Sequence, residues 1–206
     1  PIARLTNEYN VFVLPPNSPL ASMQDVLRQF RQDPRSVRWG GGSRGSTEHV
    51  AVHMLARTLQ VDSRDINYIP FRGGGEAAAA LMAGYLSVGG SGLSEFLPHI
   101  ASGRMRAVAV TSDRRLPGVE APTLRELGQD VVIGNWRGVC APTGLTAEQR
   151  AGLIEAVRQA LASGTWAQAL QRHRWLPEPL LGEPFEAFVA REFESMRSVL
   201  LKAGLG

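Results

Sequence analysis

Hydrophobic positions along the first two thirds of the chain follow two different periods in turn. Short continuous runs of apolar and β-branched residues predict buried strands, and apolar residues spaced three and four apart predict helices between them. The expected strands cover residues 9–14, 37–39, 66–71, 86–92 and 105–111, with a long or broken strand over 131–141. Strands that alternate with helices in this way predict an α/β protein with a mostly parallel sheet.

Helix-start signals locate several of the helices. Ser22 followed by Asp25 is a variant of the capping box, and Thr146 followed by Gln149 is a complete one. The expected helices include a short one over Leu124–Leu127 capped by Thr123, one after Thr146 that buries Leu153, Ile154, Val157 and Leu161, one from Thr165, and a last one from Glu183 to Gly204. The chain is therefore expected to become helical after residue 142.

Three of the expected strands end in glycine-rich turns that lead directly into helices. A helix start leaves its first backbone N–H groups without internal partners and carries partial positive charge, and glycines let an anion approach these groups. The first turn, residues 40–46, is not a P-loop, because no Gly-Lys-Ser or Gly-Lys-Thr follows it, and its glycine spacing does not match the dinucleotide fingerprint. We expect an anion-binding loop; a tight strand-to-helix connection without a ligand is the alternative.

The same reasoning gives candidate ligand contacts at all three turns. They are Ser43, Gly45, Ser46 and Thr47 in the first turn, Arg72, Gly73, Gly74, Gly75 and Glu76 in the second, and Ser91 and Gly92 in the third. Backbone N–H groups and hydroxyls can hold a carboxylate without a full positive charge, although Ser46 also suits an N-cap. Arg72 can pair with a second carboxylate or be solvated. Glu76 can stabilise the helix dipole or bind an ammonium or hydroxyl group of the ligand.

Composition narrows the classes of function. The formal net charge is +3 and the charges are mixed along the chain, so a nucleic-acid partner is not expected. No apolar run reaches the length of a membrane span, and the single cysteine, Cys140, excludes an internal disulfide. Pro1–Leu5 reads like the interior of a domain, so we expect a processed or truncated chain from which a signal peptide is absent.

Histidine and cysteine residues give no strong signal for catalysis. His49 lies one turn into the helix after the first glycine turn, where a buried, hydrogen-bonded structural role is expected. His53 follows four residues later, but no third ligand at a recognisable spacing completes a metal site, so neither a metal nor a cofactor is expected. Cys140 is expected to be a small core residue; the competing hypothesis is an enzyme that uses Cys140 with His49 or His99.

Several short motifs follow one another in a characteristic order. They are Trp39 to His49, Pro70-Phe71-Arg72-Gly73-Gly74, Gly84 before an x-Val strand, Arg104 to Ser112 with Arg114 after it, Ala121-Pro122-Thr123 with Glu126 and Gly128, and Asn135 to Val139 with Ala141-Pro142. In order and spacing they resemble the periplasmic solute receptors of tripartite tricarboxylate transporters, the Bug family, over nearly the whole chain. The chain departs from the usual pattern at Gly41 in place of serine, at Arg72-Gly73 in place of lysine-glycine, and at Glu76. These departures concern the identity of the ligand more than the fold.

The resemblance implies a type II periplasmic-binding-protein fold of two lobes with mostly parallel sheets. Family members begin with a further α/β segment, so the resemblance implies that the first lobe is incomplete in this chain. Residues 1–14 would end the first lobe, residues 15–133 would form the second lobe with its ligand loops, and residues 134–206 would supply a hinge strand and helices that complete the first lobe. Trp136 would pack between the lobes.

The resemblance also implies a role that is not enzymatic. The protein would be an extracytoplasmic, secreted and monomeric receptor that closes its lobes on a small organic anion of the di- or tricarboxylate type. It would deliver the anion to the membrane subunits of a tripartite tricarboxylate transporter. A ligand-sensing subunit that presents its closed form to a signalling partner is the alternative. The sequence names no particular ligand, because the same helix starts suit many carboxylates.

Overall fold

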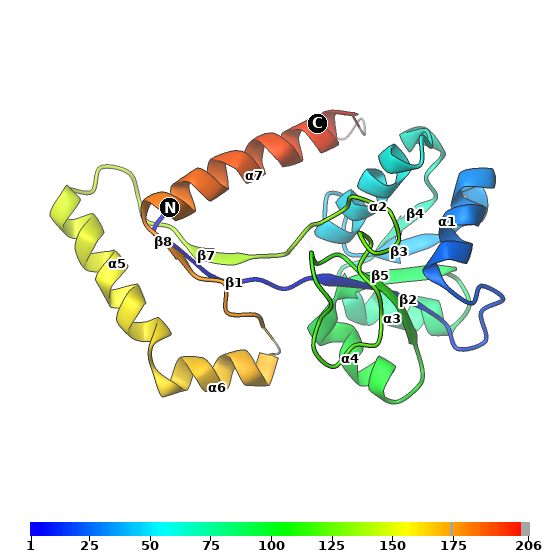
Figure 1. Cartoon of the computed structure of the whole chain (residues 1–206), viewed down its shortest axis with the longest axis horizontal. Helices are drawn as coiled ribbons and strands as arrows, with labels where there is room; N and C mark the ends of the chain where they lie inside the picture. Colours follow the sequence, from blue (N-terminus) through cyan, green and yellow to red (C-terminus); the bar gives the residue numbers. More distant parts are fainter. Residues whose placement is uncertain (174, 203–206) are drawn as a thin grey trace. The chain divides into compact units, whose positions relative to one another are not determined.

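The computed structural model describes residues 1–173 and 175–202 of the chain (Figure 1). These residues form two compact units. The central unit consists of Tyr9–Gly134 with the residues from Arg197, and the terminal unit consists of Pro1–Glu8 and Asn135–Met196. One unit is therefore built from the middle of the chain, and the other joins the first residues to the C-terminal helices.

The central unit is built on a five-stranded sheet in the order β4-β3-β5-β2-β6. The strands are β2 (Asn10–Leu14), β3 (Trp39–Gly41), β4 (Tyr68–Pro70), β5 (Val88–Gly92) and β6 (Arg106–Val110). β3 pairs in parallel with β4 and β5, whereas β2 lies antiparallel to β5 and β6. β2 alone is reversed, so its first residue lies at the edge where the other strands end.

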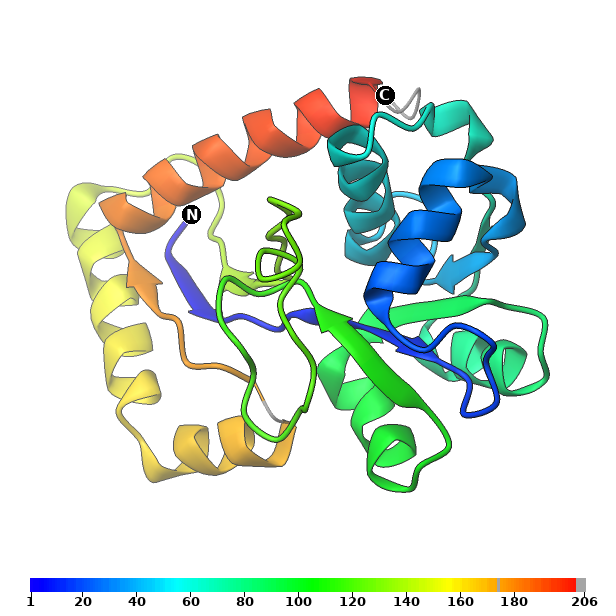
Figure 2. The same cartoon turned by 45° about the vertical axis from the view of Figure 1, so that its right-hand side comes forward.

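Helices cover both faces of this sheet (Figures 1 and 2). The helical segments are α1 (Met23–Gln32), η1 (Pro34–Ser36), α2 (Thr47–Thr58), η2 (Ser63–Asp65), α3 (Gly74–Met82) and α4 (Leu93–Ala101). α1 and α2 lie on one face, where a Cβ at Gly90 would be 3.4 Å from Glu48 Cβ of α2. α3 and α4 lie on the other face, where a Cβ at Gly89 would be 3.2 Å from Leu81 and 3.6 Å from Phe96. The unit is therefore a helix–sheet–helix sandwich, as expected for an α/β protein.

An aromatic cluster holds α1 against the sheet. Phe12 and Phe30 both meet Trp39 edge to face, with ring centroids 5.5 Å and 5.2 Å away. All three side chains are at most 1% exposed. Edge-to-face contacts of this kind stabilise a core beyond the area they bury. The cluster joins β2, α1 and β3, which follow one another along the chain.

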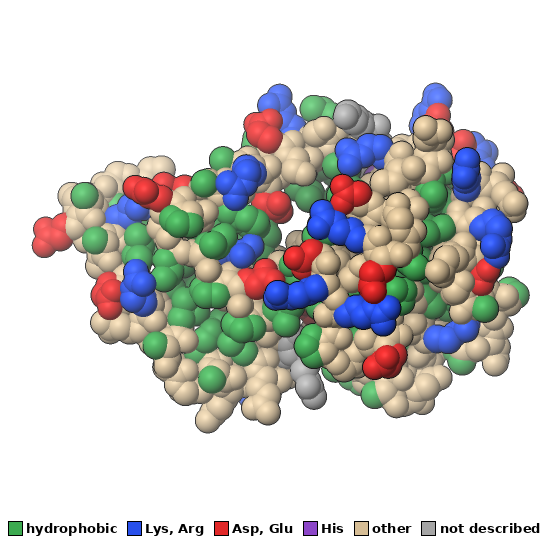
Figure 3. Space-filling model, viewed as in Figure 1, with side chains coloured by type: hydrophobic (Ala, Val, Ile, Leu, Met, Phe, Trp, Pro, Cys, Tyr) green, Lys and Arg blue, Asp and Glu red, His purple; other side chains and the backbone are tan. Residues whose placement is uncertain are grey.

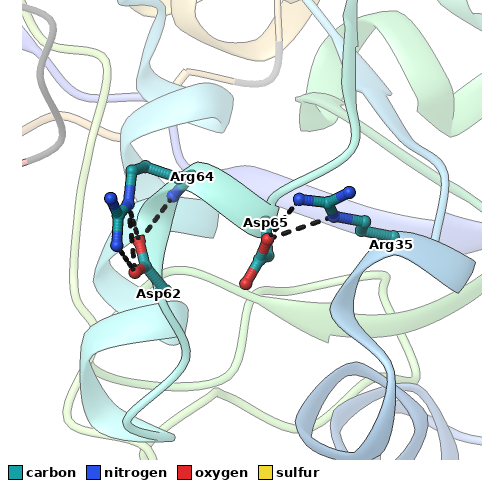
Figure 4. Close-up of polar contacts among 4 residues, drawn as sticks. All are labelled: Arg35, Asp62, Arg64 and Asp65. Carbon is teal, nitrogen blue, oxygen red and sulfur yellow. Dashed lines mark hydrogen bonds and ion pairs between the residues drawn. The ribbon is translucent and has the colours of Figure 1, made fainter.

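Charged side chains join the segments that precede β3 and β4 (Figure 4). Arg35 in η1 contacts Asp65 Oδ1 in η2 at 2.7 Å. Arg64 donates hydrogen bonds to both carboxylate oxygens of Asp62, and these bonds lower the pKa of Asp62 to about 2. Because all four side chains are exposed, the ion pairs add little stability. They mark the edge of the sheet at which β3 and β4 begin.

The terminal unit contains a three-stranded sheet in the order β7-β1-β8. Its elements are β1 (Ala3–Thr6), β7 (Arg137–Val139), α5 (Ala147–Leu161), α6 (Gly164–His173), β8 (Leu180–Leu181) and most of α7 (Glu183–Lys202). β1 lies antiparallel to both neighbours. Trp136 meets the fully buried Phe185 edge to face at 5.6 Å, and the Arg4 guanidinium lies 4.4 Å from the centroid of Phe188. The first residues of α7 therefore form the core of this unit.

Apolar side chains remain exposed in the terminal unit, and Figure 3 shows them gathered over it. No residue of α5 or α6 is buried, and Leu153 is 42% exposed. The prediction that α5 buries Leu153 is therefore wrong, while Ile154, Val157 and Leu161 are half-buried. The apolar stripe of a helix is buried only where another element covers it, and the described residues of this unit cover α5 only in part.

Several local predictions are confirmed and others are corrected. The capping boxes at Ser22–Asp25 and Thr146–Gln149 both form. Residues 131–133 form no strand, so the expected long strand is confined to β7. Leu124–Leu127 forms turns rather than a helix, and Gly128 follows it with a left-handed φ of 78°. The expected end of the last helix at Gly204 lies outside the described residues.

The central unit begins at Tyr9 rather than at Pro15. β2 pairs with β5 and β6 along its length and lies between them in the sheet. β2 therefore belongs to the same compact unit as the strands that carry the glycine turns. None of the described helices has both the length and the apolar character that crossing a membrane requires.

The aromatic cluster gives a prediction for stability. Phe30→Ala removes a fully buried ring and should lower the free energy of unfolding by about 3–5 kcal/mol, because it loses both burial and packing. Tyr85→Ala is the control from the same unit; its ring is 69% exposed, and the change should be within about 0.5 kcal/mol. Urea unfolding followed by circular dichroism measures both values, and equal effects would contradict this core.

Candidate ligand-binding site

Three parallel strands of the central unit end side by side, and each leads within a few residues into a helix. β3 leads into α2, β4 into α3 and β5 into α4, and the three strands are neighbours in the sheet. We call these strand-to-helix turns, residues 42–47, 71–76 and 91–93, the loop edge. All of the candidate contacts named from the sequence lie on it. Open α/β sheets bind ligands at the carboxyl ends of their strands, so the loop edge is the candidate site.

The start of α2 combines a side-chain cap with free backbone donors. Ser46 is the N-cap, and its hydroxyl accepts the His49 N–H at 3.5 Å. The backbone N–H groups of Thr47 and Glu48 donate no hydrogen bond to any described residue. Such donors in a first helical turn attract an anion, and the helix dipole adds to the attraction. Ser46 therefore caps α2, which is one of the two roles that the sequence analysis gave it.

The turn before α2 is held in shape by its own hydrogen bonds. Gly45 has φ +82°, a left-handed conformation that glycine adopts without strain, and it donates its N–H to His49 Nδ1 at 3.0 Å. The exposed Ser43 accepts the Ser46 N–H through its carbonyl at 3.0 Å. The N–H of Gly45 is therefore already used, and the donors open to a ligand are those of the first helical turn.

The start of α3 has no side chain on its N-cap. Gly73 is the N-cap, and the N–H groups of Gly74 and Gly75 have no hydrogen-bond acceptor among the described residues. The exposed Glu76 carboxylate instead accepts the Arg72 N–H at 3.1 Å, and so places negative charge at the positive end of the helix. The Arg72 guanidinium is exposed and makes no ion pair with a described residue. This geometry agrees with the alternatives in which Arg72 is solvated and Glu76 stabilises the helix dipole.

The starts of α3 and α4 pack directly on each other. Ser91 is 1% exposed, and its hydroxyl donates to the Glu95 carboxylate. A Cβ at Gly74 would clash with Ser91 Oγ and Glu95 Oε2, so a larger residue there would have to displace these side chains. Gly92 is the buried N-cap of α4. The Ser91 hydroxyl is thus engaged inside the protein, and the third turn offers less to a ligand than the first two.

Two buried histidines lie beneath the first turn. His49 Nε2 is 3.1 Å from His53 Nε2, and the His49 ring lies 4.3 Å from that of Tyr68. Because His49 Nδ1 accepts the N–H of Gly45, the proton of neutral His49 is on Nε2 and is donated to His53. Tyr68 donates its hydroxyl to the Gly42 carbonyl at 2.9 Å. The predicted structural role of His49 is confirmed.

Burial controls the ionisation of these groups. It lowers the pKa of His49 to about 4, with His53 and Arg44 adding to the effect, and it also lowers the pKa of His53. Burial raises the pKa of the Tyr68 hydroxyl well above its ordinary value. All three side chains are therefore neutral near pH 7 and support the turn by hydrogen bonding rather than by charge.

Sequence reasoning missed two buried polar residues at the loop edge. Asn10, at the start of β2, is fully buried, and its side-chain Oδ1 accepts the hydroxyl of Thr47 at 3.3 Å. Glu48 is 8% exposed, and its Oε2 would be 3.4 Å from a Cβ at Gly42. Asn10 stands at the head of an apolar run, and only the reversed direction of β2 brings it to the loop edge.

A hollow of about 390 Å³ in the central unit lies away from the loop edge. Its lining includes Pro15, Leu20, Arg38, Met82 and Ser87, which lie where β2 ends and β3 and β5 begin. We assign the candidate site to the loop edge rather than to this hollow, because helix starts, free N–H groups and buried polar side chains meet at the loop edge.

Cys140 and Trp136 lie in the terminal unit. Cys140 is exposed and follows β7, so the expectation of a core residue is wrong; a strand of three exposed residues buries nothing after it. Trp136 packs on Phe185 and Phe188, both at 5.6 Å, within its own unit. Among the residues that the structure describes, no group of three metal-binding side chains comes together.

Comparison with known proteins matches these features to one family. A family model described as the tripartite tricarboxylate transporter family receptor matches residues 1–199. The BugT protein of Bordetella pertussis is 27% identical over 207 residues, which cover 99% of this chain and 62% of that protein. The chain spans 58% and 62% of the length of two curated relatives.

Solved structures share the fold. A TctC solute-binding protein from Polaromonas, without a ligand, has a TM-score of 0.82 at 29% identity; the match covers 98% of this chain and 69% of that one. A protein of R. palustris with adipate has a TM-score of 0.82 at 24% identity, with 99% and 68% covered. The predicted type II periplasmic-binding fold is confirmed, but the prediction of mostly parallel sheets is wrong for the terminal unit, whose sheet is antiparallel.

The buried histidines make stability depend on pH. Between about pH 4 and 6.5 the unfolded chain binds a proton at His49 that the folded chain does not, so stability rises with pH in this interval. The free energy of unfolding should be retained above pH 6.5 and fall by up to roughly 3 kcal/mol as the pH decreases to about 4. Urea unfolding at a series of pH values measures this loss.

The control is a double variant, His49→Gln with His53→Gln, which keeps the carboxylates that also titrate in this range. Its stability should decrease less between pH 6.5 and 4.5 than that of the unmodified chain. The same decrease in both proteins would contradict the assignment to the histidines.

Proposed function

Since this chain belongs to the tripartite tricarboxylate transporter receptor family, we propose that it is a receptor that binds a small organic acid at the loop edge. The observation that carries this proposal is the group of free backbone donors at two neighbouring helix starts. Thr47 and Glu48 offer N–H groups at α2, and Gly74 and Gly75 offer them at α3. Two such starts match an acid with two carboxylates.

The ligand class that fits is a di- or tricarboxylate. Neutral N–H donors hold a carboxylate without a full opposing charge, so the ligand can be released again. No ion pair of a described residue blocks the first two turns. The adipate bound by the R. palustris neighbour is a ligand of this class and supports the assignment. The contacts would be made by residues 43 and 45–47 in the first turn and 72–76 in the second, with Ser91 and Gly92 at the side.

The cellular role follows from the family. We propose a monomeric, extracytoplasmic receptor that captures the acid with closure of its lobes and delivers it to a tripartite tricarboxylate transporter. A ligand-sensing role would use the same donors and differ only in the protein that recognises the bound form. No enzymatic step is proposed, because the loop-edge histidines bond to the backbone and to each other.

The proposal predicts a ligand-dependent rise in melting temperature. Full-length protein would be screened by thermal shift with succinate, adipate, citrate, malate and glutamate. A bound acid at about 100 times its dissociation constant adds about 2.7 kcal/mol, which should raise the melting temperature by roughly 5–10 °C. Isothermal titration calorimetry of the best acid gives its dissociation constant.

Two glycine variants test where the acid binds. Gly45→Val fills the first turn with a branched side chain and should weaken binding at least about tenfold. Gly118→Val is the matched control: both glycines have a left-handed φ, +82° and +76°, and neither would meet an atom within 4 Å of a new Cβ. Both variants should lose similar stability, about 1–2 kcal/mol. Equal affinity of the two variants would contradict binding at the loop edge, and a flat screen would contradict the receptor function.

A further inference from the structure

Asn10 presents a buried hydrogen-bond donor that the protein itself does not use. The side chain is fully buried, and its Nδ2 has no partner among the described residues. Buried amide groups are almost always paired, because an unpaired donor forfeits its hydrogen bonds to water. An exception of this kind needs an explanation.

Every other polar group of Asn10 is satisfied. Its backbone N–H donates to Thr111 Oγ1 at 3.0 Å, and its carbonyl accepts the Thr111 N–H at 3.0 Å. Its side-chain Oδ1 accepts the hydroxyl of Thr47 at 3.3 Å. Thr111 Oγ1 is in turn fixed by donation to the Ile133 carbonyl at 2.7 Å. The residue is therefore held rigidly by three contacts, and the donor left over cannot turn away to find a partner.

The Asn10 side-chain donor lies at the loop edge. Asn10 is paired with Gly92 across β2 and β5, so it stands beside the start of α4. Its contact with Thr47 places its amide next to the first residue of α2, whose own N–H is free. Thr47, which has a free backbone donor, and Asn10, which has a buried free side-chain donor, are thus joined by a hydrogen bond.

We propose that Asn10 is a ligand-binding residue, whose Nδ2 donates to the carboxylate that the start of α2 holds. This proposal rests on the proposed receptor function and adds a side-chain contact to it. The ligand oxygen takes the place of the missing acceptor, so binding removes the unsatisfied donor. An acid with a carboxylate at this point is preferred over an amide or an amine, since a carboxylate oxygen accepts more strongly.

Two variants separate the donor from the rest of the side chain. Asn10→Asp keeps an oxygen for Thr47 but replaces the donor with a carboxylate oxygen, and it should weaken binding of the best acid of the screen more than a hundredfold. Asn10→Ala removes the donor without adding charge and should weaken binding about tenfold to a hundredfold. Asn67→Ala is the matched control: it is an asparagine of the same unit whose Nδ2 donates to the Arg35 carbonyl at 3.1 Å, away from the loop edge. It should leave the affinity unchanged.

A measurement on the unmodified protein covers the case in which these variants do not fold. The side-chain amide signals of Asn10, assigned by ¹⁵N-edited NMR with residue-selective labelling, should shift strongly on saturation with adipate or the best acid of the screen. The signals of Asn67 should not move.

The outcomes distinguish this proposal from the receptor function. If the unmodified protein binds an acid but both Asn10 variants bind it equally well, or the Asn10 signals stay in place at saturation, the proposal is overturned and the receptor function stands. If no acid of the screen binds, both are overturned.

Discussion

A helix that begins within a few residues of a strand end cannot satisfy its first backbone N–H groups, and the loop edge depends on this constraint. The three turns supply acceptors for only some of these groups. In α2 the Ser46 hydroxyl satisfies one donor and leaves those of Thr47 and Glu48. In α3 the glycines supply no side chain, so the donors of Gly74 and Gly75 also remain. The unsatisfied groups are a property of the fold, and the proposed ligand would complete them.

Close packing makes this arrangement possible. A Cβ at Gly41 would lie 2.8 Å from the Gly90 carbonyl and 2.7 Å from the Tyr68 hydroxyl, so β3 must end on a glycine for the chain to pass there. Gly74 meets the same requirement between the starts of α3 and α4. These glycines are therefore used for close approach, whereas Gly45 is used for its left-handed conformation. One residue type serves two different purposes on the same edge.

Sequence patterns predicted the elements of the central unit well, because the pattern that indicates a strand or a helix lies within a short stretch of sequence. Both capping boxes and the three glycine turns are local signals of this kind. The direction of β2 is not local: it depends on which strands lie beside it. For that reason the sequence pattern did not reveal that β2 lies between β5 and β6, and it gave no reason to consider Asn10. The exposure of Cys140 and Leu153 was missed for a similar reason, since an apolar spacing shows which face is apolar but not whether anything covers it.

The hydrogen bond from Gly45 to His49 has a consequence for how the first turn can be observed. Because a backbone N–H can only donate, it excludes a proton from His49 Nδ1, and this choice fixes the direction of the bond to His53 as well. The tautomers of two buried rings are thus set by the conformation of one exposed glycine. If the turn changes shape so that this N–H points elsewhere, both rings are released to exchange their protons. The ring nitrogens of the two histidines therefore report on the conformation of the loop from inside the protein.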